Sequence, residues 1–411
     1  MFYLYNLLTY CAIFILHIVA LFNKKIKLFV QGRKTSFITL KDKIGKNDKV
    51  FWIHVASLGE YEQGLPVMEK LKIAYPDYKI VLTFFSPSGF EVKKNNTIAD
   101  VTVYLPMDTI HNTTKFLDIT HPEKAFFVKY EYWPNYLHQL HKRNINTYLI
   151  SGIFRQDQVF FKWYGGFYRK ALKAFTYFFV QNSTSQRLLN QLHFQNIEIV
   201  GDTRFDRVSQ ILDNCNTLDF LDQFTNDKNS KTVVVGSSWP EDEKLICDYI
   251  NNNEDPNTKF IFAPHNIKQE QINNLIKAIN KPLVLHSEHK GKILSQYTVY
   301  IIDAYSLLTK AYSYADIAYV GGGFGAGIHN VLEAATFGVP VVIGPKYNKF
   351  QEAKDLIALG GCKVIHNQNE LNNTFNDLLQ DEGQRAKIGQ ISSQFILKNK
   401  NATDKILQHI L

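Results

Sequence analysis

The sequence predicts an α/β protein with two doubly wound halves, each built on a parallel sheet. Short apolar runs alternate with helix-length segments along both halves of the 411-residue chain. The length predicts two or three domains at about 100–200 residues each. A composition of 45% hydrophobic and 20% charged residues excludes a chain that is mainly disordered.

The apolar runs are far enough apart for crossover helices between parallel strands. In the first half they predict strands at Val50–Ser57, Lys79–Phe85, Val101–Leu105, Lys124–Tyr130, Ile145–Ser151, Tyr177–Gln181 and Ile197–Gly201. In the second half they predict strands at Lys231–Ser238, Lys259–His265, Lys281–Ser287, Val299–Asp303, Ala315–Gly323, Val339–Pro345 and Cys362–Ile365. Because ligands bind at the carboxyl ends of such strands, we expect the active site in a central cleft between the halves.

Positive charge is concentrated near the N-terminus. The formal net charge is +8, and residues 23–50 alone carry nine basic against two acidic side chains, a net +7. Residues 1–22 contain no Asp, Glu, Lys or Arg. A basic block directly after an apolar segment is typical of attraction to anionic lipid rather than to nucleic acid. We therefore expect a membrane with anionic lipids as a partner, and no nucleic acid.

Residues 1–22 are long enough for a membrane helix of about 20 residues. No positive charge precedes the apolar run and no small-residue cleavage site follows it, which excludes a cleaved signal peptide. Positive charge on its C-terminal side predicts that the other residues are cytoplasmic. The favoured interpretation is a single N-terminal anchor that spans the bilayer or lies in its interface, and the alternative is a buried core helix.

The four cysteines, Cys11, Cys215, Cys247 and Cys362, are far apart and outside any Cys-x-x-Cys or Cys/His cluster. This spacing predicts neither a disulfide framework nor a structural zinc site, and it favours a reducing compartment. We also find no His-x-x-x-His pair or Asp-x-Asp triplet for a catalytic cation, so no metal site is expected.

A glycine-rich string, YVGGGFGAGIHN, contains G-x-G-x-x-A at Gly321, Gly323 and Ala326. A dinucleotide fingerprint belongs in the first βα unit, so this position disfavours NAD binding. The glycines still let a ligand approach the backbone, and a helix opening near Asn330 would direct N–H groups at a phosphate. Asn330 and Glu333 share one helix face, either as acceptors for base or ribose hydroxyls or simply as an N-cap and a helix-start Glu.

Three charged residues follow strands of the first half. Glu60 opens a helix directly after a strand, as a catalytic base would, although an ordinary helix-start Glu is the alternative. Glu131 ends another strand and lies either at the cleft or in a solvated turn. Arg204 is suited to a phosphate or a sugar carboxylate, or to a salt bridge with Asp202 or Asp206.

Several strings taken together are more specific than any one of them. They are SLGE, SPSG (Ser86–Gly89), EYWPN, SGIF (Ser151–Phe154), GDTRFD, APH (Ala263–His265) and HNVLEAATFGVPVVIGP. In this order and spacing, over nearly the whole chain, they resemble the Kdo transferases of lipopolysaccharide synthesis. The resemblance implies a GT-B fold of two Rossmann-like domains. It also implies inverting transfer of 3-deoxy-D-manno-octulosonic acid (Kdo) from CMP-Kdo to a phosphorylated lipid A precursor, without metal or cofactor.

By this resemblance Glu60 is the general base, Glu131 stabilises the transition state, and Arg204 stands where the family has a stabilising Lys. The implied CMP site comprises Pro264, His265, Tyr305, Ser306, Leu307, Asn330, Val331, Leu332 and Glu333. Two strings depart from the family: its Pro-Arg-His loop reads Ala-Pro-His here, and its Met-Gly-Glu-like turn reads Tyr-Ser-Leu.

The expected organisation is an anchor (1–22), a basic membrane-proximal segment (23–50), an acceptor-binding domain (51–207), a linker (208–230) and a CMP-sugar-binding domain (231–411). The last helix is a candidate to pack back on the N-terminal domain. We expect a single displacement, at the cytoplasmic face of the inner membrane, in which Glu60 takes the proton of the attacking hydroxyl and CMP leaves from the opposite face. The alternatives are a nucleotide-sugar epimerase on the same scaffold and a membrane-tethered nucleotide-binding scaffold without activity.

Overall fold

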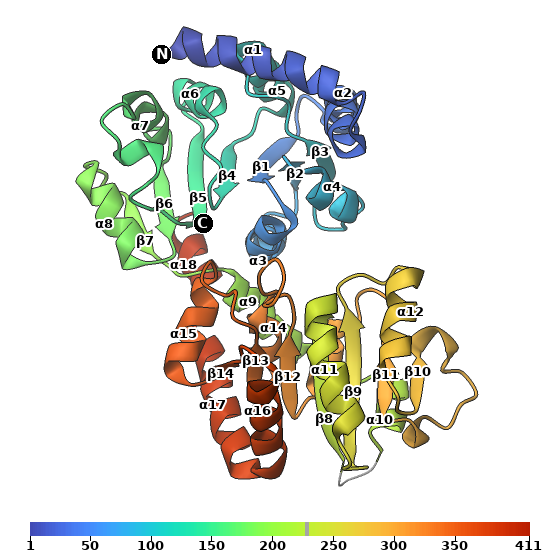
Figure 1. The fold of residues 1–411 in the computed structure, drawn as a ribbon. Coiled ribbons are helices and arrows are strands. Elements are labelled where there is room, and N and C mark those ends of the chain that lie inside the picture. The colour runs from blue at the N-terminus through green and yellow to red at the C-terminus, as the bar shows by residue number, and fades with distance from the viewer. Residues whose placement is uncertain (227–229) are drawn as a thin grey trace. The chain divides into compact units, whose positions relative to one another are not determined.

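The computed structural model describes residues 1–226 and 230–411 and divides into two compact units (Figure 1). The first unit comprises Met1–Arg207 and Lys400–Leu411, and the second comprises Val208–Asn399. Each unit contains a parallel sheet with helices packed on it, and every strand predicted from the sequence is present. The predicted fold class is therefore confirmed.

The sheet of the first unit has, within the described residues, seven parallel strands in the order β3-β2-β1-β4-β5-β6-β7. They are β1 (Lys49–Val55), β2 (Tyr78–Phe84), β3 (Val101–Tyr104), β4 (Lys124–Val128), β5 (Asn146–Gly152), β6 (Tyr177–Val180) and β7 (Ile197–Ile199). The strand order reverses between β1 and β4, which pair directly. The carboxyl ends of these two strands form a switch point, where open parallel sheets bind ligands.

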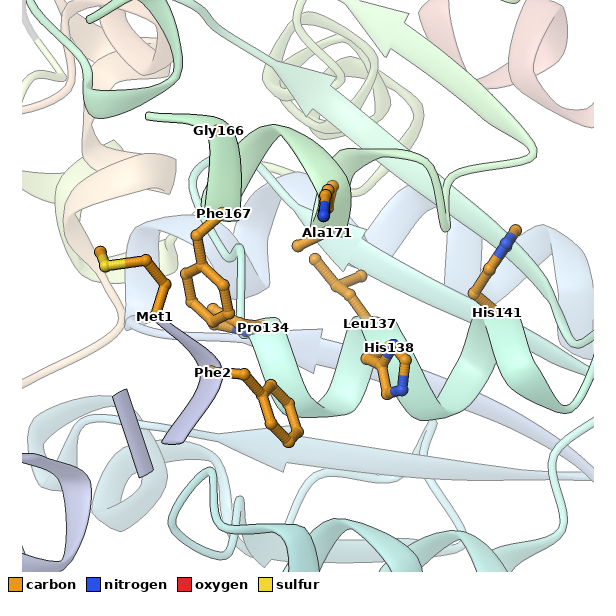
Figure 2. A pocket seen from close by; sticks show the side chains of 10 residues that line it. Met1, Phe2, Pro134, Leu137, His138, His141, Gly166, Phe167 and Ala171 are labelled. Carbon is orange, nitrogen blue, oxygen red and sulfur yellow. The ribbon is translucent and has the colours of Figure 1, made fainter. Parts of the chain in front are cut away.

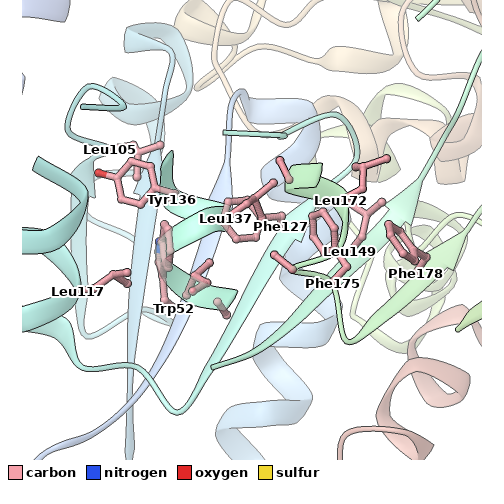
Figure 3. Close-up of a cluster of buried hydrophobic side chains, with 14 of the residues drawn as sticks. Trp52, Leu105, Leu117, Phe127, Tyr136, Leu137, Leu149, Leu172, Phe175 and Phe178 are labelled. Atoms are coloured by element: carbon pink, nitrogen blue, oxygen red, sulfur yellow. The ribbon is translucent and has the colours of Figure 1, made fainter. Parts of the chain in front are cut away.

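Helices cover both faces of this sheet. They are α1 (Phe2–Val19), α2 (Lys24–Lys43), α3 (Leu58–Ala74), α4 (Pro87–Lys93), α5 (Ile110–Thr120), α6 (Pro134–Lys142), α7 (Gly166–Leu172), α8 (Ser183–Gln191), the start of α9 (Arg204–Ser209) and α18 (Ala402–Gln408). Side chains of β1 alternate between the two faces because successive residues of a strand point in opposite directions. Trp52 packs with Phe127 and Tyr136 in the cluster of Figure 3, whereas Phe51 packs in a second cluster with residues of α3 and α18.

Polar side chains, besides aromatic contacts, hold the apolar helix α1 to the rest of the first unit. The Tyr5 hydroxyl donates a hydrogen bond to Asp108 Oδ2 (2.7 Å), and the Asn6 and Asn135 amides bond each other, with Nδ2 of Asn135 3.0 Å from Oδ1 of Asn6. Asn6 is the buried residue of this helix. The alternative of a buried core helix is wrong, because only 6% of α1 is buried; among the described residues it alone is long and apolar enough to cross a membrane.

The basic segment does more than follow the anchor. Its helix α2 packs against β3, and the Arg33 guanidinium donates to the carbonyls of Leu105 (2.9 Å) and Phe85 (2.8 Å). The Ser36 hydroxyl donates to the Tyr104 carbonyl (2.9 Å). Residues 24–43 therefore belong structurally to the first unit, because the inner side of α2 satisfies backbone carbonyls at the ends of its strands.

The sheet of the second unit has, in the described part of the chain, seven parallel strands in the order β10-β11-β9-β8-β12-β13-β14. They are β8 (Lys231–Ser238), β9 (Thr258–Pro264), β10 (Leu283–Leu285), β11 (Val299–Ile301), β12 (Ile317–Val320), β13 (Val341–Ile343) and β14 (Cys362–Val364). Its helices are α10 (Asp219–Phe224), α11 (Pro240–Asn252), α12 (Gln269–Ala278), α13 (Leu308–Ala311), α14 (Val331–Ala335), α15 (Gln351–Leu359), α16 (Gln368–Gln380) and α17 (Glu382–Asn399). The order reverses between β8 and β12, giving this unit its own switch point.

The sequence predicts a linker at residues 208–230, of which residues 227–229 lie outside the described part. The other residues of this segment belong to the second unit. Its helix α10 packs there through Leu221 and Phe224, which are fully buried. The segment after α17 returns to the first unit. There α18 contacts α3, and Lys70 pairs with Asp404.

Candidate active site and donor site

Glu60 lies in the first turn of α3, immediately after the carboxyl end of β1. Its carboxylate accepts hydrogen bonds from the backbone N–H groups of Ala56 and of Ser57 (3.1 Å for Ser57), so it closes the turn that leads into its own helix. The SPSG string (Ser86–Gly89) packs against the same turn. A Cβ at Gly89 would lie 2.9 Å from the Leu58 nitrogen, and only glycine allows α4 to approach the start of α3 this closely.

Burial determines the protonation of Glu60. The residue is only 7% exposed, and burial, together with the nearby charge of Glu131, raises the pKa of its carboxyl to about 7. The backbone N–H groups of Ala56 and Ser57 and the charge of Lys129 act in the opposite direction. A carboxylate with a pKa near neutrality can accept a proton at physiological pH, which an ordinary helix-start Glu does poorly.

Glu131 follows β4, the strand beside β1, and is not in a solvated turn: it is 9% exposed. Its Oε2 lies 2.7 Å from the Trp133 indole nitrogen and 3.0 Å from Nε2 of His54. The Trp-Pro pair after Glu131 thus does more than end the strand, because the indole N–H holds the carboxylate. Oε1 of Glu131 takes part in no hydrogen bond within the described residues, so it is available to a ligand.

His54, which the sequence analysis missed, lies inside β1 and is completely buried. Its Nδ1 is 2.9 Å from the Thr83 hydroxyl oxygen. The same hydroxyl oxygen accepts a hydrogen bond from the Trp52 indole N–H (2.9 Å). Both contacts to Oε2 of Glu131 are satisfied when His54 Nε2–H and Trp133 Nε1–H donate to it. The signal was an imidazole within an otherwise apolar strand, and such a group needs buried partners.

Arg204 forms the salt bridge that the sequence analysis left open. Its guanidinium donates twice to Oδ2 of Asp202, from Nε (3.0 Å) and Nη2 (2.8 Å). Burial raises the pKa of Asp202, but the charge and hydrogen bonds of Arg204 outweigh it and keep that pKa below its ordinary value. Asp206, the other candidate partner, instead accepts from the N–H and hydroxyl of Thr403 at 2.6 Å each.

Tyr130 links these groups into one site. Burial raises its pKa, and the charges of Arg155, Glu60 and Arg204 all act on it. Its hydroxyl accepts a hydrogen bond from Nη2 of Arg155 (2.8 Å). Glu60 and Glu131 follow β1 and β4 at the switch point, and Arg204 follows β7. The partner of Arg204, Asp202, accepts a hydrogen bond from Gln63 of α3 (3.0 Å), the helix that also carries Glu60. Tyr130 and Arg155, which the sequence analysis did not select, lie with them.

The donor candidates lie at the strand ends of the second unit. Gly322 and Gly327 have φ of +93° and +120°, and a Cβ at Gly323 would lie 2.6 Å from Gly344, so the loop after β12 requires glycine at these positions. Buried Asp242 holds the loop by accepting from the backbone N–H of Gly322 (2.7 Å) and the Tyr319 hydroxyl (2.8 Å).

An aromatic stack lies beside this loop. The His265 ring stacks on Trp239 (5.0 Å between centroids, 13° between planes) and contacts His329 at 4.5 Å. The Trp239 indole N–H donates to Nε2 of His329 (3.0 Å), which requires that nitrogen to be unprotonated. Burial, and then the neighbouring His265, lower the pKa of His329 to about 4, so its ring is neutral at physiological pH. Trp239 and His329 were absent from the predicted site.

Glu333 is oriented by two side chains. Asn330 Nδ2 donates to its Oε1 (3.0 Å) and the Thr309 hydroxyl donates to its Oε2 (2.8 Å). Asn330 also caps α14, because its Oδ1 accepts a hydrogen bond from the Leu332 N–H (3.1 Å). The N-cap, which the sequence analysis gave as the alternative role of Asn330, is therefore present. Thr309 belongs to α13, which starts directly after Leu307, so the Tyr305–Leu307 turn and Glu333 lie together.

Two expectations about this helix need correction. Val331 and Leu332 are 1% and 0% exposed, so their side chains pack in the core and can offer a ligand only backbone groups. Helix α14 has five residues, and the aligned peptide dipoles of so short a helix favour a phosphate less than the sequence suggested.

In the turn before α13, Tyr305 is 73% exposed, and Ser306 has φ of +70°. Within the described residues no group of three or more His, Cys, Asp or Glu is placed to hold a metal ion.

Comparison with known proteins adds to this geometry. Residues 31–207 match the family model described as 3-deoxy-D-manno-octulosonic-acid transferase (kdotransferase). The 3-deoxy-D-manno-octulosonic acid transferase of Rickettsia bellii is 26% identical over 375 residues, covering 89% of this chain and 88% of the relative.

Two solved structures share the fold. UDP-GlcNAc 2-epimerase from Neisseria meningitidis has a TM-score of 0.62 at 16% identity over 88% of this chain and 99% of its own. MurG from Acinetobacter baumannii has a TM-score of 0.55 at 12% identity over the same shares. With its two parallel sheets the chain has the GT-B fold, and its sequence is similar to the Kdo transferase family, whose model matches residues 31–207.

Proposed function

We propose that this protein transfers Kdo from CMP-Kdo to a phosphorylated lipid A precursor of the lipid IVA type, with inversion at the anomeric carbon. The observation that carries the proposal is the pair of buried carboxylates at the β1/β4 switch point, of which Glu60 has a pKa of about 7. The epimerase alternative rests on likeness of fold, and fold alone does not assign chemistry. The related sequences favour the transferase.

Glu60 acts as the general base. The acceptor hydroxyl oxygen attacks the anomeric carbon of Kdo while its proton passes to the Glu60 carboxylate. The bond between the anomeric carbon and the CMP phosphate oxygen breaks, and its electron pair leaves with CMP. Since attack and departure occur on opposite faces, the anomeric configuration inverts.

Glu131 and Arg204 support this step in different ways. The charge of Glu131 keeps the pKa of Glu60 high, and its Oε1 is available to stabilise positive charge that develops on the sugar ring. Arg204 supplies a cation to the same site. Because it is paired with Asp202, we assign it the stabilisation of the donor's carboxylate or phosphate rather than a proton transfer.

CMP binds the second unit through the residues around Glu333 and His265. Glu333, held by Asn330 and Thr309, accepts from the ribose hydroxyls, and the glycine loop lets the nucleotide approach the backbone. We propose that protein groups alone stabilise the leaving phosphate, without a metal ion or cofactor. Chelation by EDTA should therefore leave the transfer rate unchanged when preformed CMP-Kdo is supplied.

The acceptor comes from the cytoplasmic face of the inner membrane. The exposed apolar side of α1 and the outward lysines of α2 support attachment to an anionic bilayer. The decisive experiment incubates purified protein with CMP-Kdo and lipid IVA and measures the product mass. A mass increase of one or more Kdo units supports the proposal, and an epimerised or unchanged donor with unmodified lipid contradicts it.

A further inference from the structure

A pocket of 580 Å³ lies in the first unit between α1, α6 and α7, apart from the carboxylate site (Figure 2). Its lining includes Phe2 of α1, Pro134, Leu137 and His138 of α6, and Phe167 and Lys170 of α7. The volume is in the range of small-molecule sites. The N-terminal turn of the apolar helix thus forms a wall of the pocket.

The lining suits a chain that is apolar along its length and negatively charged at one end. The ring centroids of Phe2 and Phe167 lie 6.5 Å apart, and those of Phe2 and His138 lie 5.8 Å apart. Leu137 and Ala171 continue the apolar wall in Figure 2. Lys170 adds a cation. An acyl chain with a phosphate-bearing head group has this combination of properties.

The structure of α1 brings this pocket to a membrane surface. Its 18 residues measure about 27 Å, close to the thickness of a hydrocarbon core. If α1 spanned the bilayer, Asp108, which is 2% exposed and bonded to Tyr5, would be drawn toward hydrocarbon at considerable cost. The helix therefore lies in the interface, with exposed side chains such as Tyr3 (87%) and Phe14 (69%) available to lipid.

A second aromatic group supports this placement. Trp163 is 91% exposed and precedes α7, whose residues line the pocket. Indole rings prefer the boundary between head groups and acyl chains. The part of the lining that α6 supplies starts at Pro134, the residue after Trp133, whose indole N–H holds Glu131.

We propose that this pocket binds one acyl chain of the phosphorylated glycolipid acceptor, taken from the membrane in which α1 lies. The inference rests on the proposed function and adds to it the part of the acceptor that the first unit recognises. Binding the chain beside α6 keeps the lipid on the enzyme while its head group reacts. Acceptors without acyl chains should then be used less efficiently.

The first test compares Gly166→Trp with Gly166→Ala. Gly166 lines the pocket, and a Cβ there would meet only Arg169 Nη2, at 3.6 Å, so the alanine variant should fold as the natural chain does and controls for the loss of glycine. The tryptophan should fill the pocket. We expect it to lower kcat/KM for lipid IVA at least tenfold more than kcat/KM for fully deacylated lipid IVA. Equal losses on both acceptors would overturn the proposal.

The second test needs neither catalysis nor a variant. The full-length protein is mixed with phosphatidylglycerol vesicles that carry a diazirine at the end of one acyl chain, irradiated and digested. Labels on the peptides holding Leu137 and Phe167 support the pocket. Labels confined to the outward side of α1, or no labels, overturn it. If the natural enzyme transfers Kdo to neither acceptor, the proposed function fails, and the labelling still decides whether a chain enters the pocket.

Discussion

Two glutamates occupy the same helix position in the two units and differ in what surrounds them. Glu60 and Glu333 are each the third residue of a helix at the strand ends of a sheet. Glu60 accepts from backbone N–H groups and lies beside another carboxylate, which with burial raises its pKa to about 7. Glu333 accepts from two side chains, Asn330 and Thr309. Position on the helix therefore does not set the role that we propose for each residue. Burial and a neighbouring carboxylate suit Glu60 to accept a proton, and two neutral donors hold Glu333 as a hydrogen-bond acceptor.

The largest effect should come from Glu60→Gln. Glutamine keeps the shape of the side chain but cannot take the proton, so we expect kcat to fall by roughly 10²–10⁴ while CMP affinity stays unchanged. Glu69→Gln, on the same helix, is the matched control and should be nearly as active as the natural enzyme. Steady-state transfer kinetics decide the matter. Near-normal turnover of the Glu60 variant would remove it from the base role.

Glu333→Ala should act on binding instead. Loss of the carboxylate leaves ribose hydroxyls unpaired, which should weaken CMP by about 1–3 kcal/mol, or roughly 5- to 150-fold. Glu370 provides a close control, because it is also the third residue of its helix and is also bonded by its N-cap, Asn367. Calorimetry should show unchanged CMP affinity for Glu370→Ala. If Glu333→Ala binds CMP as tightly as Glu370→Ala does, Glu333 has only a structural role in helix α14.

His54 tests whether the orientation of Glu131 matters to the base. His54→Phe removes the Nε2–H donor to Oε2, whereas His54→Gln offers an amide N–H in its place. We expect the phenylalanine variant to lose about tenfold in kcat with little change in the KM for CMP-Kdo, and the glutamine variant to recover part of it. Ser36→Ala removes another buried hydrogen bond of this unit and controls for general destabilisation. Identical kcat values for the two His54 variants would contradict a positioning role.

A further effect concerns stability rather than turnover or binding. Because the folded protein raises the pKa of Glu60 from 4.5 to about 7, the contribution of Glu60 to the stability of the folded state is fully present below pH 4.5 and is lost as the pH rises through 7. Glutamine does not ionise. Glu60→Gln should therefore gain about 1–3 kcal/mol over the natural chain at pH 9 compared with pH 5, measured by urea unfolding. If the two proteins differ in their free energy of unfolding by the same amount at pH 5 and pH 9, ionisation of Glu60 does not destabilise the folded state, and the raised pKa is contradicted.

The sequence predicted most of the fold because the strands of both sheets are short apolar runs separated by helix-length segments. It also found Glu60 and Glu131, since charged residues directly after such runs lie at the ligand-binding edge. His54 escaped detection because it lies within a strand, where its partners Thr83 and Glu131 come from neighbouring strands. Asp206 could not be distinguished from Asp202 as a partner of Arg204, because its own partner, Thr403, is almost 200 residues away in sequence.

The donor side was harder to predict for a related reason. The string HNVLEAA marked Asn330 and Glu333 correctly as a unit, but no local pattern indicates that Thr309 reaches Glu333 or that Trp239 stacks on His265. These contacts join separate βα units across one sheet. The burial of Val331 and Leu332 likewise follows from packing in the second unit rather than from the motif.

The most direct test of the account is the pH dependence of kcat/KM for the natural enzyme and for Glu131→Gln. With Glu60 as the base, activity of the natural enzyme should rise with pH through an apparent pKa of about 7. Removal of the Glu131 charge should move that rise to lower pH, because this charge is one of the causes that raise the pKa of Glu60. A rise near the ordinary carboxyl range in the natural enzyme, or one that Glu131→Gln leaves in place, would contradict the coupled pair of carboxylates.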